Sequence, residues 1–148
     1  MVQTGGHIET SEIAESFYSL AEAWADDGAA NGALPVESVY REWTEDPAVR
    51  VPFARNAGHF GSDSALHMSS ILETLGIGPE QLGSLQPDHL AVELNVAGIL
   101  AEMAPGALSQ FLEDRLDWLD DLEDAGAETP SRLELIGATR RCIRAVTR

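Results

Sequence analysis

The chain has 148 residues, and its 25 acidic residues outnumber the nine basic ones, so that the formal net charge at pH 7 is −16. So strong a negative charge repels phosphate groups and disfavours binding to nucleic acids and to anionic membranes. The length and the hydrophobic content of 44% suit one domain, residues 1–148, with a core of its own. The acidic surface suits a cationic partner or a cytoplasm of high salt concentration, and a halophilic source is our hypothesis.

The sequence shows no targeting or membrane segment. It has no run of 18 apolar residues, and residues 1–6 lack the basic start and apolar core of a signal peptide. The single cysteine, Cys142, excludes an intrachain disulfide and a cysteine-rich metal site. We therefore expect a cytoplasmic protein without membrane insertion.

Hydrophobic residues at helical spacing predict a first helix after a loose lead-in of residues 1–9. Its apolar face is formed by Ile13, Phe17, Leu20, Ala21 and Trp24. The run Asp26-Asp27-Gly28 ends this helix, and residues 28–34 form a loop or hinge.

A short connector follows at residues 35–43, with Pro35 imposing an extended entry. Glu37, Tyr40 and Trp43 are spaced by three residues, which places them on one face if the segment forms a helical turn. Two interpretations stay open: the aromatic side chains pack into the core, or they form the wall of a groove with neighbouring hydroxyl groups.

Residues 44–61 are irregular and receive no assignment. A helix is predicted from Ser62 or Asp63 to Leu75, because Ser62 can cap its start and Gly76 can close its end. A short helical turn is predicted after it, beginning at residues 78–80.

The next helix is predicted from Pro87 to about Met103, because proline fits the first helical position. Its apolar face is formed by Leu90, Leu94, Ala97 and Ala101. Asp88 falls in the first turn, where free N–H groups favour a carboxylate, and the adjacent His89 can donate from either ring nitrogen, depending on protonation. The pair either serves the helix start alone or forms a small polar recognition corner.

The C-terminal part is predicted to hold two further helices. Pro105-Gly106 forces a reversal, and one long amphipathic helix runs from Leu108 to about Ala125 with carboxylates on its outer face. Thr129 caps a last helix, residues 130–148, which carries five of the nine arginines and should dock beside the acidic helix. Without any strand pattern, the fold class is all-α, a single-domain helical bundle of about five or six helices.

Catalytic constellations are not visible. The four histidines form no His-Glu-x-x-His pattern, and neither a phosphate loop nor a nucleophile elbow is present. His89 and Glu93 are four residues apart and offer half of a metal site, but no further ligands accompany them. We therefore expect a binding protein with no catalytic residues, no metal and no cofactor of its own.

Two stretches, Pro35-x-Glu37-Ser38-Val39-Tyr40 and Pro87-Asp88-His89-Leu90-x-x-Glu93-Leu94, resemble the signature segments of the TorD/DmsD family of redox-enzyme maturation chaperones. The helix at residues 64–77 and the segment at 111–119 resemble the corresponding parts of that family, so that the resemblance covers about residues 34–125. Related chaperones of NarJ type usually carry another residue at the position of His89, which favours the TorD/DmsD side.

The resemblance implies an all-helical cytoplasmic chaperone. Such a protein binds the apo catalytic subunit of a molybdenum oxidoreductase of the DMSO-reductase type, and often its twin-arginine signal peptide, before cofactor insertion. Matched by position, the candidate peptide-binding residues are Asp88, His89, Pro35, Glu37, Ser38 and Tyr40, to which we add Trp43 and Glu93. The alternative is a non-catalytic assembly subunit of such an oxidoreductase, including the nitrate-reductase type, without signal-peptide recognition.

The predicted bundle is shortened at the N-terminus relative to the family, because only one helix precedes Pro35. Either part of the usual bundle is missing, or a second chain supplies it. A homodimer that swaps an element through residues 28–34 is one such arrangement.

Overall fold

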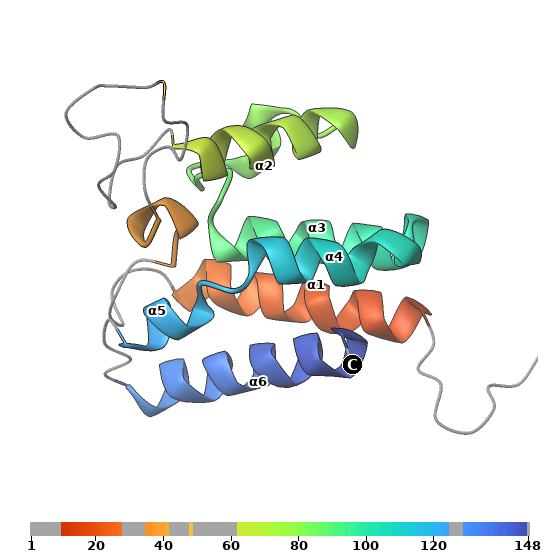
Figure 1. Ribbon diagram of the computed structural model, residues 1–148. Helices are drawn as coiled ribbons and strands as arrows, with labels where there is room; N and C mark the ends of the chain where they lie inside the picture. The colour runs from red at the N-terminus through yellow and green to blue at the C-terminus, as the bar shows by residue number, and fades with distance from the viewer. Residues whose placement is uncertain (1–9, 28–34, 42–47, 49–61, 125–128, 148) are drawn as a thin grey trace, which may run out of the picture.

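In the part of the chain that it describes, a computed structural model shows a bundle of six α-helices and two short 3-10 helices (Figure 1). It describes residues 10–27, 35–41, 48, 62–124 and 129–147. The elements are α1 (Thr10–Asp27), η2 (Glu37–Val39), α2 (Asp63–Thr74), η3 (Pro79–Leu82), α3 (Leu90–Met103), α4 (Pro105–Arg115), α5 (Leu119–Asp124) and α6 (Pro130–Thr147). Within these residues there is no strand, only an isolated bridge between Val36 and His89, which confirms the predicted all-α class.

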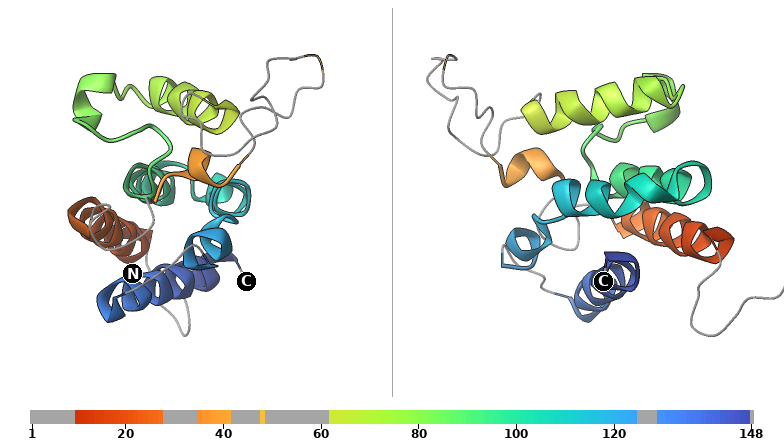
Figure 2. Two further views of the ribbon diagram at one scale, coloured as in Figure 1. Left: turned by 90° about the vertical axis from the view of Figure 1, so that its left-hand side faces the viewer. Right: turned by 45° about the vertical axis from the view of Figure 1, so that its right-hand side comes forward.

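Helix α3 lies at the centre of the bundle and packs against both α1 and α4. In Figure 2, α2 and η3 form a layer on one side of α3, while α1 and α6 lie on the other side. Nine of the residues of α3 are buried, among them the predicted face of Leu90, Leu94, Ala97 and Ala101. A helix that is apolar on nearly every side is stable only when it is enclosed, which explains its central place.

The close packing of α1 on α3 depends on Gly98. A Cβ atom at this position would lie 2.7 Å from Cδ1 of Tyr18, whose hydroxyl donates a hydrogen bond to Glu102. The absence of a side chain at Gly98 therefore gives the Tyr18 ring its place against the backbone of α3.

Helix α6 is fastened to α1 and to α5 by polar contacts. The indole N–H of Trp24 donates to Oγ1 of Thr139 at 2.9 Å, and the buried guanidinium of Arg132 lies 5.1 Å from the centre of the Trp24 ring. Arg140 binds both Asp120 (2.7 Å) and Glu123 (2.8 Å) of α5. The predicted docking of the arginine-rich helix beside the acidic segment is thus confirmed.

At two helix ends, the local sequence was sufficient to predict where the helix begins or ends. Thr129 caps α6 by accepting a hydrogen bond from the N–H of Arg132 at 3.2 Å, as predicted. At the end of α2, Gly76 adopts a φ of 79°, and the N–H of Ile77 reaches the carbonyl of Leu72 at 2.9 Å. This is a Schellman motif, which requires a left-handed residue and explains why glycine stands there.

Two predicted helices had wrong boundaries. The helix expected from Pro87 begins at Leu90, with His89 as its N-cap. The single helix expected from Leu108 to Ala125 begins at Pro105, because proline fits the first helical position, and the turn lies at Ala104. It is also divided into α4 and α5, because the indole of Trp118 donates to the carbonyl of Arg115 at 2.7 Å and takes the place of a backbone N–H. No helix in the described part of the chain is long and apolar enough to cross a membrane.

Replacing Gly98 by alanine should destabilise the fold by about 1–3 kcal/mol, because the new methyl group displaces the Tyr18 ring from a packed contact. The control is Gly106→Ala, where an added Cβ meets nothing within 4 Å and a gain of about 0.4–1 kcal/mol is expected. Urea unfolding of both variants measures the difference. Equal stabilities would contradict the role of the close approach.

Candidate functional site

The two signature segments meet through their main chains. The N–H of Glu37 donates to the carbonyl of Asp88 at 3.0 Å, and the N–H of Leu90 donates to the carbonyl of Pro35 at 2.8 Å. This pair of bonds is the isolated antiparallel bridge between Val36 and His89. Val36 (φ −125°, ψ 127°) and His89 (φ −66°, ψ 142°) both have an extended backbone, which allows the two segments to pair in this way.

Side chains reinforce this junction in a group that we call the polar clasp: Glu37, Ser38, Ser62, Asp88 and Glu93. Each of these side chains is buried with an exposed fraction of 0%. Oδ2 of Asp88 accepts hydrogen bonds from the N–H of Ser38 at 2.7 Å and from the Ser38 hydroxyl, which also lies 2.7 Å from Oγ of Ser62. Ser62 stands at the N-cap position of α2 as predicted, but its hydroxyl serves the clasp instead of the helix.

Burial raises the pKa of Asp88 above its ordinary value, although the hydrogen bonds from Ser38 act in the opposite direction and the charge of Glu37 adds to the rise. Oδ1 of Asp88 has no hydrogen-bond partner among the described residues. Asp88 therefore organises the turn at residues 37–40 and retains one oxygen that can accept a further donor.

His89 begins α3 as its N-cap. Its Nδ1 accepts a hydrogen bond from the N–H of Ala91 at 3.0 Å, and only 5% of the residue is exposed. Burial, together with the charge of Arg132, lowers the pKa of His89 to about 4. The imidazole is thus neutral near pH 7 and carries its proton on Nε2, so that only one ring nitrogen can donate.

Glu37 and Glu93 form a buried pair of carboxyl groups that joins the two signature segments. The indole N–H of Trp118 donates to Oε1 of Glu93 at 3.1 Å, and the carboxyl group of Glu93 lies beside that of Glu37. Burial, followed by the hydrogen bond and the charge of Glu37, raises the pKa of Glu93 well above its ordinary value. The neutral form of Glu93 is therefore favoured, and it can donate its proton to the Glu37 carboxylate.

Two arginines balance the charge of Glu37. Arg41, one helical turn further along the chain, pairs with Glu37 and also with Asp117, while Nη1 of Arg115 lies 3.6 Å from Oε2 of Glu37. Tyr40 stacks on Trp118 with ring centres 5.6 Å apart and an angle of 15° between the planes. The ring of Tyr40 thus packs on the clasp, which agrees with the interpretation that the aromatic side chains of residues 35–43 pack into the core.

The structure brings most of the predicted site residues together. Glu37, Ser38, Asp88 and Glu93 lie in the clasp, Pro35 contributes its carbonyl, and Tyr40 and His89 lie beside it; Trp43 lies outside the described residues. Sequence reasoning missed the partners that complete the group: Arg41, Ser62, Arg115 and Trp118. The spacing of four between Glu37 and Arg41 was the available signal for one of them.

Fold and site together define a helical bundle in which a buried polar group joins residues 35–41 to the start of the central helix α3. Within the described residues, no three histidine, cysteine or acidic side chains are placed to hold a metal ion. The family model described as "Nitrate reductase delta subunit" matches residues 14–129, which is most of the chain. The protein therefore belongs to this family, which comprises redox-enzyme maturation chaperones of NarJ/TorD type, and the resemblance drawn from the signature segments is confirmed.

Family membership assigns a general role in the maturation of a molybdenum enzyme, in a family whose members are non-catalytic chaperones. Comparison with curated proteins and with solved structures gave no match. The matched range contains both signature segments and ends before α6, which begins at Pro130.

Replacing Glu93 by glutamine should change how stability depends on pH. Because the folded protein raises the pKa of Glu93, its contribution is fully present below the unfolded pKa of about 4.3 and is lost as the pH rises through the folded value. Glutamine keeps a donor towards Glu37 and cannot ionise, so the variant should gain stability over the wild type with increasing pH. Urea unfolding at several pH values tests this, with the exposed Glu113→Gln as control; a difference independent of pH would contradict it.

Replacing His89 by asparagine should make the variant gain stability over the wild type as the pH falls, which is the opposite pH dependence to that of Glu93→Gln. The folded pKa of about 4 lies below the unfolded value of about 6.5, so the wild type loses up to about 3 kcal/mol from this residue as the pH falls between the two values. Asparagine keeps the N-cap and removes this loss. Thermal unfolding between these pH values should show a flatter profile for His89→Asn, whereas the exposed His67→Asn should follow the wild type.

Proposed function

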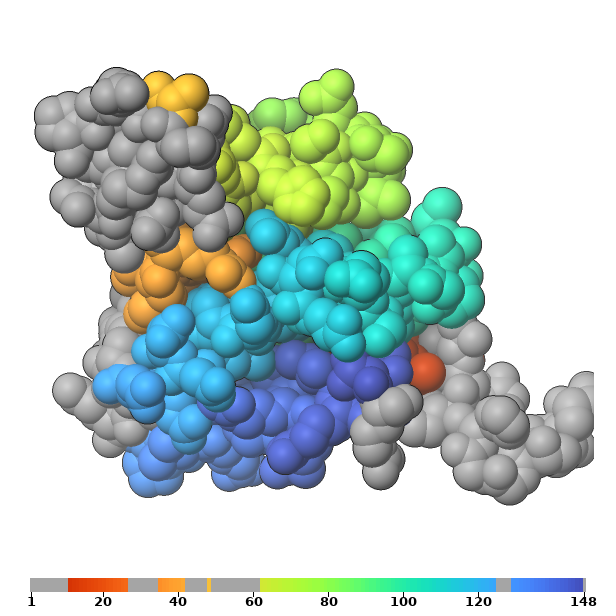
Figure 3. All heavy atoms as spheres, in the orientation of Figure 1, coloured from red at the N-terminus to blue at the C-terminus, as the bar shows by residue number. Residues whose placement is uncertain are grey.

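We propose that the protein acts in the cytoplasm, where it binds the apo catalytic subunit of a molybdenum oxidoreductase of the DMSO-reductase type, the twin-arginine signal peptide of that subunit, or both, before the cofactor is inserted. The observation that carries this proposal is the meeting of the two signature segments at one junction. On the face shown in Figure 3, residues 35–41 reach the surface beside α4 and α5, where a peptide could lie against them.

The candidate binding residues remain Asp88 and His89, with Pro35, Glu37, Ser38, Tyr40 and Glu93 around them. Trp43, which lies outside the described residues, stays a candidate from the sequence alone. Oδ1 of Asp88 is the atom that supports a direct role, because a buried carboxylate oxygen without a donor among the described residues is satisfied well by a guanidinium group. The burial of Asp88 means that such a contact requires residues 35–41 to shift. The net charge of −16 favours capture of a basic peptide, less so at high salt.

Titration of a synthetic twin-arginine peptide tests the site. Asp88→Asn removes the charge and keeps an acceptor for the N–H of Ser38, so affinity should fall by about 1.5–3 kcal/mol while stability changes little. Ser38→Ala keeps the charge and removes a clasp hydrogen bond, so stability should fall by about 1–3 kcal/mol with a smaller loss of affinity.

Each pattern of results has one meaning. Equal affinity of Asp88→Asn and the wild type would defeat the assignment of Asp88 as a peptide contact. Losses of affinity that follow the losses of stability in both variants would make Asp88 a positioning residue, which shapes the surface through Ser38.

A second candidate function is favoured by the complete burial of the clasp carboxylates. In this alternative, the protein is a non-catalytic assembly subunit that holds the body of the oxidoreductase, including one of nitrate-reductase type, and does not recognise a signal peptide. Co-purification with a client lacking its leader, at the yield obtained with the full-length client, would favour this alternative.

A further inference from the structure

An apolar cavity of about 230 Å³ lies between α3 and the layer that α2 and η3 form on one side of it. Its floor is aliphatic and comes from α3, where Val92 and Val96 are fully buried and Ile99 is half-buried. None of the residues of the polar clasp lines this cavity. It is therefore separate from the candidate peptide site.

The layer of α2 and η3 lines the opposite side of the cavity with side chains, without close packing of its backbone on α3. Leu72 of α2 is buried, and Ile77, Leu82 and Leu85 are half-buried against the core. Among the other elements, α2 contacts chiefly η2, and neither α2 nor η3 packs closely along α3. The space between the layer and α3 is what the cavity measures.

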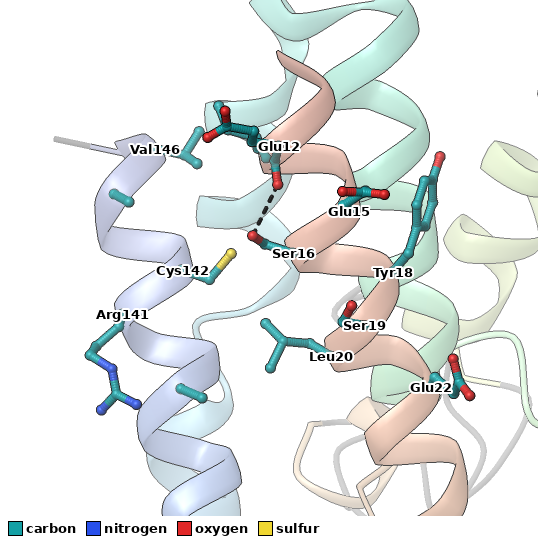
Figure 4. Close-up of a pocket in the computed structure, with 13 residues that line it drawn as sticks. Glu12, Glu15, Ser16, Tyr18, Ser19, Leu20, Glu22, Arg141, Cys142 and Val146 are labelled. Atoms are coloured by element: carbon teal, nitrogen blue, oxygen red, sulfur yellow. Dashed lines mark hydrogen bonds between the residues drawn. The ribbon is translucent and has the colours of Figure 1, made fainter. Parts of the chain in front are cut away.

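Tyr18 lines the cavity from α1. Figure 4 shows its ring on the flank of α1 that is turned away from α6, and Gly98 allows the ring to lie against α3. The hydroxyl of Tyr18 donates to Glu102, which holds the ring in this position. The cavity thus has residues of α1, α2, η3 and α3 around it and is not an open face of one helix.

A cavity of this size is unusual in a protein interior, where side chains pack as closely as molecules in an organic crystal. An engineered cavity of about 150 Å³ with an apolar lining stays dry and binds benzene. The present cavity is larger and its lining is also mainly apolar, so it has room for an aliphatic chain of about eight carbon atoms. Such a molecule would supply the dispersion contacts that the empty lining lacks.

The polar groups around the cavity favour an uncharged ligand. Among the described residues that line it there is no charged side chain, and the polar ones are Tyr18, Gln81 and Asn95. Asn95 is exposed and marks where the cavity meets solvent, and its carboxamide can both donate to and accept from a hydroxyl or amide group. A buried charge is costly without a partner, so an ionised ligand is disfavoured.

A neighbouring cavity adds to the discrimination against anions. It has a volume of about 460 Å³ and shares Leu72 and Leu82 with the first cavity. Glu73 and Glu80 line it, and no basic residue does so in the described part of the chain. A carboxylate or phosphate that reached past Leu82 would meet these carboxylates and no cation.

We propose that the cavity between α3 and the layer of α2 and η3 binds a small uncharged aliphatic molecule, with its hydrocarbon body on Val96 and Leu82 and its polar group at Asn95. This ligand site does not rest on the proposed function, and either can fail without the other.

Methyl NMR with two matched compounds tests the site in the wild type. 1-Octanol should shift the methyl signals of Val92, Val96 and Leu82 until they saturate, and it should leave those of Leu122 and Ile136, which are buried on α5 and α6, in place. Octanoate has the same chain length and a carboxylate that is ionised at about pH 7. At equal concentration it should produce roughly a tenth of the effect or less.

Filling the cavity gives an independent test. Ile99→Phe places additional carbon atoms in the empty space, so it should raise the melting temperature of the free protein and weaken binding of 1-octanol by about tenfold or more. The control is Ile143→Phe, the same change at a half-buried residue of α6 that does not line the cavity. This control should alter the affinity by about twofold or less.

Saturable shifts of the lining methyl groups that Ile99→Phe abolishes would support the inference. Shifts of equal size at Leu122 and Ile136 would overturn it, because they indicate general adsorption of the alcohol. Equal binding of octanoate would overturn the preference for an uncharged ligand. A lower melting temperature of Ile99→Phe, with no saturable shift in the wild type, would overturn the site itself, because the layer then closes on α3 and leaves no cavity.

Discussion

The junction of the two signature segments depends on the bond between Asp88 and Ser38, which are separated by 50 residues in the chain. Bringing such distant residues together costs about 3–4 kcal/mol of loop-closure entropy, so the junction must be stabilised by contacts that form together. Two main-chain hydrogen bonds and the buried side-chain bonds of the clasp supply them. The signature residues thus hold residues 35–41 against the start of α3, a contact that the local structure of each segment does not provide.

The carboxyl pair explains why an acidic residue, Glu93, stands inside the apolar helix α3. A buried ionised carboxylate is costly unless it is paired, and two adjacent ones repel. The pair of Glu37 and Glu93 avoids this cost by holding a proton at Glu93 and by placing the guanidinium groups of Arg41 and Arg115 beside Glu37. A buried polar group of this kind favours one arrangement of the helices around it, because separating Glu37 from Arg41 and Arg115 would leave a buried charge unpaired.

Local signals in the sequence predicted much of the bundle, and tertiary contacts decided the rest. The N-cap at Thr129 and the end of α2 at Gly76 could be predicted, because helix capping and left-handed turns follow from residue type alone. The break between α4 and α5 could not be predicted, because it arises from tertiary contacts of the Trp118 indole. Its N–H donates to the carbonyl of Arg115 and to Oε1 of Glu93. The sequence predicted which residues belong to the site. It could not predict that these residues are buried, since their burial depends on how η2 covers the start of α3.

The position of α2 and η3 between the two fastened segments has a consequence for how the molecule opens. Among the other elements, α2 contacts chiefly η2, and Ser62 before α2 and Asp88 after η3 are both held in the clasp. Loss of the clasp would therefore release this layer as one cooperative unit, while the packing of α1, α3, α4 and α6 persists. Amide hydrogen exchange in α2 would then report a sub-global opening whose free energy combines the hydrogen bonds of the clasp with the burial of Met68 and Leu72, and is smaller than the free energy of unfolding the whole bundle.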